Sequence, residues 1–198
     1  MAQVIINWNC RGFHRNIDEV KMFLQDYTPA ALCLQETFLE ASRVVDFRKY
    51  ISYNYFSRST DERPAGGSSI LVKRSIVHRE IRLQSTLQAV AVSLTILKTF
   101  TLCSVYIPPS HNLTLGELNN LIEQLPPPYI VVGDYNAHNF LWGCSDVNNK
   151  GKVVEDFISE NNLCIWNDGS STYIHPAFGS HSFIGSSLTF CRLHLGSS

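Results

Sequence analysis

The most informative segment of this chain is Gly133-Asp134-Tyr135-Asn136-Ala137-His138-Asn139-Phe140-Leu141-Trp142-Gly143. It directly follows the apolar run 129–132, so it predicts a buried strand that ends where a carboxylate and a carboxamide occur two residues apart. Residues i and i+2 of an extended backbone point to the same side. We therefore expect Asp134 and Asn136 to reach into one cleft. An acid and an amide at one place suit a site that holds a phosphate and activates a water molecule.

Length and composition indicate a single domain that spans residues 1–198. Hydrophobic residues make up 44% of the 198 residues, which is enough for a substantial core. The 16 Lys and Arg residues nearly balance the 17 Asp and Glu residues, so the formal net charge is −1. This balance argues against a protein that is held to nucleic acid by bulk positive charge, but it leaves room for a local basic groove.

The cysteines and histidines show no metal-binding pattern. The six cysteines include no CxxC pair, and several lie inside apolar runs such as 31–34 and 102–105. Their pattern favours free, buried thiols in a reducing compartment. The seven histidines are scattered without the spacing of zinc ligands.

The sequence contains no recognisable targeting or membrane segment. Residues 1–7 lack a basic region followed by an apolar region, so no signal peptide is predicted. The longest apolar-rich stretch, residues 87–97, is interrupted by Ser93 and Thr95 and is too short to span a bilayer. We expect an intracellular protein without membrane contact, and a nuclear one if it acts on genomic DNA.

Hydrophobic patterns predict strands and helices in mixed order. Strands are expected at residues 4–9, 31–35, 50–57, 68–73, 77–83, 87–97, 100–107, 129–133, 163–167 and 172–174. Helices are expected at residues 17–28, 114–125 and 152–161, and the first two begin with the spacing of a capping box. Strands that mostly neighbour one another, with helices between them, suggest an α/β fold of two packed sheets covered by helices on the outside. The strand ends that carry polar residues then meet at one edge, which is the candidate site.

Five polar residues at predicted strand ends could carry chemistry together. They are Asn9, Glu36, Tyr106, Asp134 and Asn136. Glu36 offers a hard oxygen ligand for Mg²⁺, and Asp134 could orient or deprotonate an attacking water. The two asparagines could donate hydrogen bonds to a phosphate, and Tyr106 could add a hydroxyl group. Each residue alone is more simply a solvated turn residue or a packing tyrosine, so the hypothesis depends on the joint pattern.

Several blocks of this sequence resemble one known superfamily. The blocks are, in order, 7–12 (Asn-Trp-Asn-Cys-Arg-Gly), 34–37 (Leu-Gln-Glu-Thr), 67–70 (Gly-Ser-Ser-Ile), 104–109 (Ser-Val-Tyr-Ile-Pro-Pro) and 133–138 (Gly-Asp-Tyr-Asn-Ala-His). They are similar to the blocks of the endonuclease/exonuclease/phosphatase superfamily. The longer form that ends at Gly143, together with residues 167–173, resembles the apurinic-type endonuclease domain of non-LTR retrotransposons of the jockey, R1 and I kind. The resemblance runs from about residue 4 to about residue 191.

The resemblance implies both a fold and an activity. The implied fold is a four-layer αββα sandwich of two mixed β-sheets flanked by helices. The implied activity is Mg²⁺-dependent nicking of DNA, with Mn²⁺ as an alternative ion, by a domain whose parent element also carries a reverse transcriptase module. Asn9, Tyr106, Asp134 and Asn136 fall on catalytic positions, and Glu36 and Asp134 fall on metal positions. His138 belongs to the motif and either contacts DNA or braces the loop.

The C-terminal part departs from the family pattern. Gly185 stands where the family has an aspartate, and the chain ends without the final Ser-Asp-His block, which His194 does not replace. A general acid or base contributes roughly 10²–10⁴-fold in rate. The resemblance therefore predicts a domain that is incomplete at its C-terminus and that binds metal and DNA yet cleaves slowly.

DNA contact would depend on local cations and on the aromatic end of the motif. Arg11, Lys73, Arg74 and Trp142 are the predicted DNA-binding residues, and Arg15, Arg58, Arg63, Lys150 and Lys152 lie in or near presumed loops. An equally strong interpretation makes these cations a solvated surface. Two other functions stay open for the chain as a whole: a phosphoesterase of the same fold that acts on lipid or small-molecule phosphates, and a non-catalytic remnant that at most binds nucleic acid.

Overall fold

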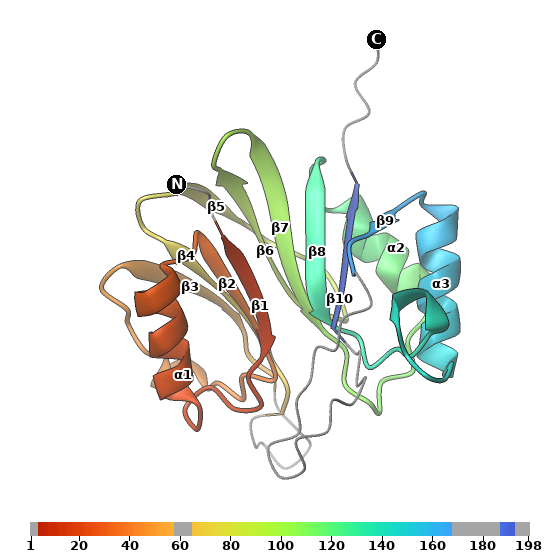
Figure 1. The fold of residues 1–198 in the computed structure, drawn as a ribbon, viewed down its shortest axis with the longest axis horizontal. Helices are drawn as coiled ribbons and strands as arrows, with labels where there is room; N and C mark the ends of the chain where they lie inside the picture. Colours follow the sequence, from red (N-terminus) through yellow and green to blue (C-terminus); the bar gives the residue numbers. More distant parts are fainter. Residues whose placement is uncertain (1–3, 58–64, 168–186, 193–198) are drawn as a thin grey trace.

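Two β-sheets pack face to face in this computed structural model, which describes residues 4–57, 65–167 and 187–192. Helix α1 (Ile17–Met22) covers the outside of the first sheet, and α2 (Leu115–Glu123) and α3 (Asn149–Glu160) cover the outside of the second (Figure 1). The arrangement is the αββα sandwich that the sequence predicts. No helix within the described residues is long and apolar enough to cross a membrane.

The first sheet has the strand order β1-β2-β4-β3. Its strands are β1 (Ile5–Asn9), β2 (Ala31–Gln35), β3 (Tyr50–Tyr55) and β4 (Ser68–Lys73). β1 and β2 are parallel and pair Asn9 with Gln35, whereas β4 is antiparallel to β2 and pairs Gln35 with Ser68. The ends of β1 and β2 and the start of β4 therefore meet at one edge of this sheet.

The second sheet has the order β5-β6-β7-β8-β10-β9. Its strands are β5 (Val77–Ile81), β6 (Gln88–Thr95), β7 (Thr99–Tyr106), β8 (Tyr129–Asp134), β9 (Cys164–Ile165) and β10 (Ser187–Arg192). β7 and β8 are parallel and pair Tyr106 with Asp134 at their ends. β1 also contacts β8 across the sandwich. The polar ends of both sheets are thus brought to one edge.

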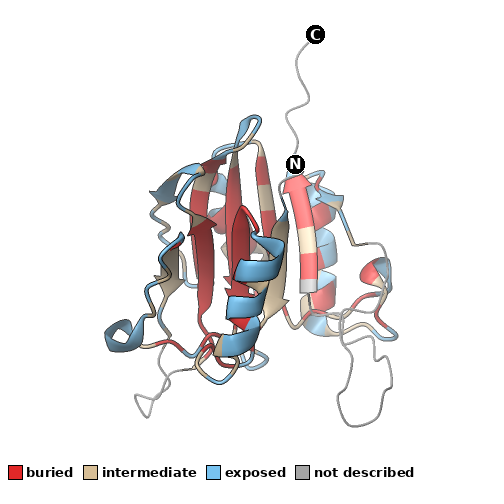
Figure 2. Ribbon diagram, turned by 60° about the vertical axis from the view of Figure 1, so that its left-hand side comes forward, coloured by how far each residue is buried: buried red, intermediate tan, exposed pale blue. Residues whose placement is uncertain are grey.

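Three apolar clusters hold the layers together. One lies between the sheets and includes Cys33, Ile70 and Leu102, and the other two lie between each sheet and its helices. Central strands are buried along most of their length (Figure 2). All six cysteines are free and five are buried, as predicted. Burial raises the pKa of the Cys33 and Cys103 thiols, so these cysteines act as small apolar side chains.

The helix starts differ in part from the sequence prediction. The predicted capping box at Thr114 and Glu117 is present at the start of α2. The one at Asn16 is not formed, because the Asn16 side chain donates to the carbonyl of Cys10 instead. Helix α1, which follows Asn16, continues as a π-helix over Phe23–Tyr27. Helix α3 starts three residues earlier than predicted, because its first turn carries no apolar residue that a periodicity could detect.

Strand β1 and the C-terminal region complete the comparison. The residues of β1 are only half-buried, because β1 is the edge strand of its sheet. The strand expected at 172–174, and Gly185 and His194, lie outside the described residues.

Candidate active site

A single amide joins the two sheets at their shared edge. The Asn9 side-chain nitrogen donates to Oε1 of Glu36 at 2.9 Å and also to Oδ2 of Asp134. Asn9 is the last residue of β1 and Glu36 directly follows β2, both in the first sheet, whereas Asp134 is the last residue of β8 in the second. The structure therefore brings two carboxylates, far apart in the chain, within hydrogen-bond reach of one nitrogen.

Tyr106 completes this group from the neighbouring strand β7. Tyr106 is 5% exposed and lies close to the carboxylates of Glu36 and Asp134. Burial raises the pKa of the Tyr106 hydroxyl well above its usual value, and the negative charges of Glu36 and Asp134 raise it further. The hydroxyl is therefore protonated at neutral pH and acts as a hydrogen-bond donor.

Asp134 and Asn136 lie together for a reason other than the one expected. Strand β8 ends at Asp134, and Asn136 has φ 47°, so the backbone between them is not extended. Instead, the Asn136 backbone N–H donates to Oδ1 of Asp134 at 3.0 Å, and the Asn136 side chain donates to the carbonyl of Ile107 at 3.0 Å. A turn closed by the aspartate carboxylate, rather than the pleat of a strand, places the two side chains.

A buried polar network lies beneath the site and also crosses between the sheets. The Gln35 side-chain nitrogen donates to Asn7 at 2.8 Å and to the Ser104 hydroxyl at 2.9 Å, and Ser68 donates to Ser104 at 2.8 Å. Gln35, Ser68 and Ser104 are all fully buried. The sequence prediction missed these residues, although polar side chains inside otherwise apolar strands are the signal that could have revealed them.

His138 is held in the loop that follows the site. Its Nδ1 lies 3.0 Å from Oδ1 of Asp146, and its backbone N–H donates to the side chain of Asn148 at 3.1 Å. A Cβ added at Gly151, in the first turn of α3, would come within 1.8 Å of the His138 carbonyl oxygen. The loop thus packs tightly against α3, and His138 lies next to Asn136 at the cavity described below.

The predicted DNA-binding residues separate into two groups. Arg11 is exposed directly after Asn9, and its backbone N–H donates to the Asn9 side chain at 3.2 Å, so it lies beside the site. The backbone N–H of Lys73 donates to the carbonyl of Ala30, directly before β2, and Arg74 forms an ion pair with Asp46, so both residues lie at the opposite end of the first sheet. Arg58 and Arg63 lie outside the described residues.

Trp142 is not on the surface. Its side chain is 3% exposed, and its indole N–H donates to the carbonyl of Ala137 at 2.9 Å. The indole braces the loop from inside, which leaves it unable to touch DNA directly. The exposed members of the same short helix are Phe140 and Leu141.

The donor set fits a divalent metal ion. No group of three or more His, Cys, Asp and Glu side chains suited to a metal occurs in the part of the chain that the structure describes. Mg²⁺, however, is commonly held by one or two carboxylates together with water and substrate oxygens. Glu36 and Asp134 supply two such carboxylates, and a cation between them would offset their mutual repulsion.

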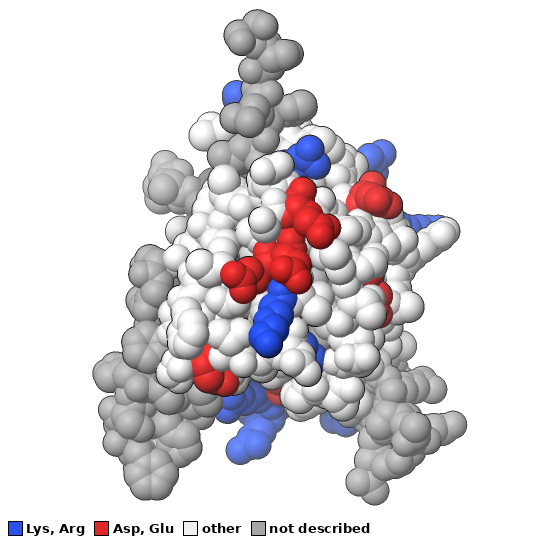
Figure 3. Space-filling view, turned by 90° about the vertical axis from the view of Figure 1, so that its right-hand side faces the viewer, with Lys and Arg blue, Asp and Glu red and all other residues white. Residues whose placement is uncertain are grey.

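The face over α3 is less suited to a polyanion. Acidic side chains gather on the face over α3, where Glu155, Asp156 and Glu160 are exposed (Figure 3).

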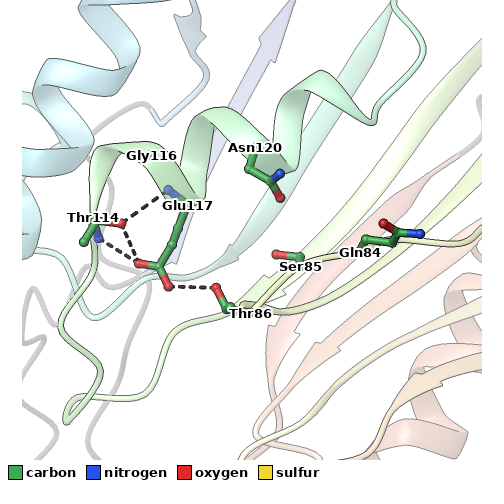
Figure 4. Close-up of a pocket in the computed structure, with 7 residues that line it drawn as sticks. All are labelled: Gln84, Ser85, Thr86, Thr114, Gly116, Glu117 and Asn120. Atoms are coloured by element: carbon green, nitrogen blue, oxygen red, sulfur yellow. Dashed lines mark hydrogen bonds between the residues drawn. The ribbon is translucent and has the colours of Figure 1, made fainter.

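A cavity of about 510 Å³ between the β5–β6 connection and α2 is lined by residues that include Ser85, Thr86 and Glu117 (Figure 4). None of the five strand-end residues lines it, so the candidate site stays at the edge where Asn9, Glu36 and Asp134 meet.

The sequence is similar to those of retrotransposon proteins. A family model described as "Endonuclease-reverse transcriptase" matches residues 100–192, which include Tyr106, Asp134 and Asn136. Two curated Drosophila melanogaster proteins are each 27% identical to this chain. They are the probable RNA-directed DNA polymerase from transposon X-element, over 93% of this chain, and the RNA-directed DNA polymerase from mobile element jockey, over 84%.

A solved structure extends the comparison to the fold. The endonuclease domain of TRAS1, a telomere-specific non-LTR retrotransposon, superimposes with a TM-score of 0.74 at 18% identity, over 94% of this chain and 83% of that one. The sequence is thus similar to part of retrotransposon RNA-directed DNA polymerases, and the fold is similar to that of a retrotransposon endonuclease domain. It spans about a fifth of the length of the two curated relatives, 21% and 18% respectively.

Proposed function

We propose that this domain nicks DNA by metal-dependent hydrolysis of a phosphodiester bond. The observation that carries the proposal is the contact of one Asn9 amide with both Glu36 and Asp134, because it joins the acidic groups of two sheets in one place. The relationship to retrotransposon endonucleases supports DNA as the substrate and a reverse transcriptase module in the parent element.

Each residue of the site has a proposed role. Glu36 and Asp134 would hold Mg²⁺ or Mn²⁺, which supplies charge stabilisation at the phosphoryl oxygens when bound. Asp134 also orients the attacking water, since its Oδ1 is already fixed by the Asn136 backbone. Asn9 holds the two carboxylates together, and Asn136 and the protonated Tyr106 hydroxyl donate hydrogen bonds to the phosphate. His138 stays a proposed member of the site, held beside Asn136 by Asp146.

The test is nicking of supercoiled plasmid by the purified chain with Mg²⁺ or Mn²⁺. We expect conversion to open circles that EDTA prevents and that Glu36→Gln or Asp134→Asn lowers by at least roughly 10²-fold, the range of a lost catalytic group. Lys73→Ala, at the far end of the first sheet, is the matched control and should nick normally. Nicking that does not require a metal ion would refute the proposal. Nicking rates of the Glu36→Gln and Asp134→Asn variants equal to that of the wild type would refute it as well.

A further inference from the structure

A polar cavity of about 480 Å³ adjoins the candidate active site. Asn136 lines both, and the other walls come from the loop after β7, the loop after β8 and the first turn of α3. The basic side chains of the wall are His111, His138 and Lys150, one from each of these three segments. The proposed chemistry above uses neither His111 nor Lys150.

The Lys150 side chain is held in place in the wall of this cavity. Its ammonium group donates to the carbonyl of Pro109 at 2.9 Å and to that of Pro108. Burial lowers the pKa of Lys150, and the negative charge of Asp134 acts in the opposite direction, so the ammonium lies within electrostatic range of the candidate metal site. The two carbonyl contacts hold the cation in place before any ligand arrives, which reduces the entropy lost on binding.

The two histidines are each oriented by a carboxylate. His111 Nε2 lies 3.0 Å from Oε1 of Glu117, and His138 Nδ1 lies 3.0 Å from Oδ1 of Asp146. Because a carboxylate only accepts, the nitrogen that faces it carries the hydrogen, and the other ring nitrogen remains for a ligand. A bound anion meets that second nitrogen as a donor when the imidazole is protonated.

The chemistry of the wall selects an anion with several oxygens. An ammonium group repels a divalent cation, and the amides of Asn112 and Asn149 offer hydrogen bonds that an apolar ligand could not satisfy. Phosphate contacts in DNA complexes come mainly from Lys, Arg and amide side chains, and they fix the register of the strand. The shared wall at Asn136 places this cavity next to the phosphate that the active site would cut.

We propose that the cavity formed by His111, His138 and Lys150 is a second phosphate subsite, which binds a neighbouring phosphate of the DNA strand that is nicked. This inference rests on the proposed DNA-nicking function and adds how the strand is held. The cavity would position the strand so that only one bond reaches Glu36 and Asp134.

The test compares DNA with a phosphodiester too small to reach the cavity. Lys150→Ala should raise the DNA concentration for half-maximal nicking roughly tenfold, as expected when a hydrogen bond to a charged group is lost. Turnover of bis(p-nitrophenyl) phosphate should stay within about twofold of wild type. Lys150→Arg should restore most of the DNA effect, and Lys152→Ala, an exposed cation on the same helix, is the matched control.

A binding measurement separates this inference from the proposed function. Fluorescence anisotropy with a short duplex measures how steeply DNA affinity falls with salt concentration, and this slope reports the number of phosphate contacts. The slope should decrease by the amount expected for about one phosphate contact in Lys150→Ala and should be unchanged in Lys152→Ala. His111→Ala provides a second variant if Lys150→Ala fails to fold. Equal losses on DNA and on the small diester would overturn the subsite, since Lys150 would then act on Asp134. Unchanged DNA binding and nicking in both variants would also overturn it. A wild type that binds DNA with this salt slope but cuts neither substrate would refute only the nicking function.

Discussion

Glu36 and Asn136 both have left-handed backbones, with φ of 51° and 47°, and Arg11 and Phe38 on the adjoining loops do as well. Asparagine tolerates this region, but glutamate and phenylalanine rarely adopt it. Such conformations cost about 1–3 kcal/mol each and persist where the surroundings enforce them. Their concentration around one edge of the sandwich points to a site that is shaped for binding at the expense of local stability.

Gly133 shows how closely one residue can control the position of Asp134. A Cβ at this position would come within 2.0 Å of the Val105 carbonyl oxygen, because β7 and β8 approach tightly there. We expect Gly133→Ala to lower the free energy of unfolding by about 1–3 kcal/mol and to reduce nicking, since Asp134 must shift with the strand. Urea denaturation measures the first effect.

The control for Gly133 is Gly116, a helical glycine whose added Cβ would meet nothing within 4 Å. Gly116→Ala should raise the free energy of unfolding by roughly 0.5–1 kcal/mol, because alanine has the higher helix propensity. If the two substitutions had the same sign, the tight approach of β8 to β7 would not be the cause.

Gln35 tests the polar network under the site. Gln35→Leu removes the hydrogen bonds that the buried Gln35 side chain donates to Asn7 and Ser104, so it should destabilise the fold by about 1–3 kcal/mol. It should also weaken Mg²⁺ binding, because Gln35 directly precedes Glu36. Gln84→Leu, at an exposed glutamine, should change stability by no more than about 0.5 kcal/mol. Denaturation and metal titration of both variants decide the point.

The start of helix α2 is hydrogen-bonded to the β5–β6 connection. Glu117 accepts from the Thr114 backbone at 2.9 Å and from the Thr86 hydroxyl at 2.8 Å (Figure 4). Burial alone would raise the pKa of Glu117, but these hydrogen bonds and the nearby His111 lower it overall. Its charged form is therefore more favourable in the folded chain than in the unfolded chain.

This shift predicts a pH-dependent contribution to stability. A carboxyl group whose pKa is lower in the folded state than in the unfolded state stabilises the folded state at pH values above its ordinary pKa of 4.5. This contribution is lost as the pH falls through the folded-state pKa. Glu117→Gln should therefore destabilise the chain at pH 7 and have a smaller effect near pH 3. Chemical denaturation at both values measures this, with Glu123→Gln, an exposed position of α2, as the control. An effect that is equal at both pH values would argue against it.

The elements also show what could be read from the sequence. The strands and the Thr114 capping box were predictable, because alternating apolar residues and a Thr-x-x-Glu spacing are local signals. The side of the molecule on which a cation lies was not. Lys73 ends a strand that runs antiparallel to β2, and only the pairing register shows that this end lies away from Glu36. Trp142 was predicted to bind DNA because no local pattern reveals that its side chain is buried and that its N–H reaches Ala137.

The candidate site was predictable for a different reason. Asn9, Glu36, Tyr106 and Asp134 are polar residues at the ends of apolar strands, and strands of a sandwich bring such ends together. The network of Gln35, Ser68 and Ser104 was missed because buried polar residues within strands reveal their partners only in three dimensions.

The proposed metal ion should link the two sheets of the sandwich and so stabilise the fold as a whole. A ligand that binds only the folded state adds about 2.7 kcal/mol at a concentration of 100 times its Kd. Mg²⁺ should therefore raise the melting temperature of the wild type in a concentration-dependent manner, and EDTA should reverse the effect. Glu36→Gln and Asp134→Asn should abolish it. This measurement does not depend on cleavage, so an unchanged melting temperature at high Mg²⁺ would count against the metal site itself.

Because Asn9 and Glu36 come from the first sheet while Tyr106 and Asp134 come from the second, neither sheet holds a complete set of reactive groups. The chain passes between them once β4 ends, within the short connection 74–76. Severing the polypeptide there would divide the domain into two inert fragments. Any nicking recovered on mixing them would report that the fragments had reassembled into the native sandwich.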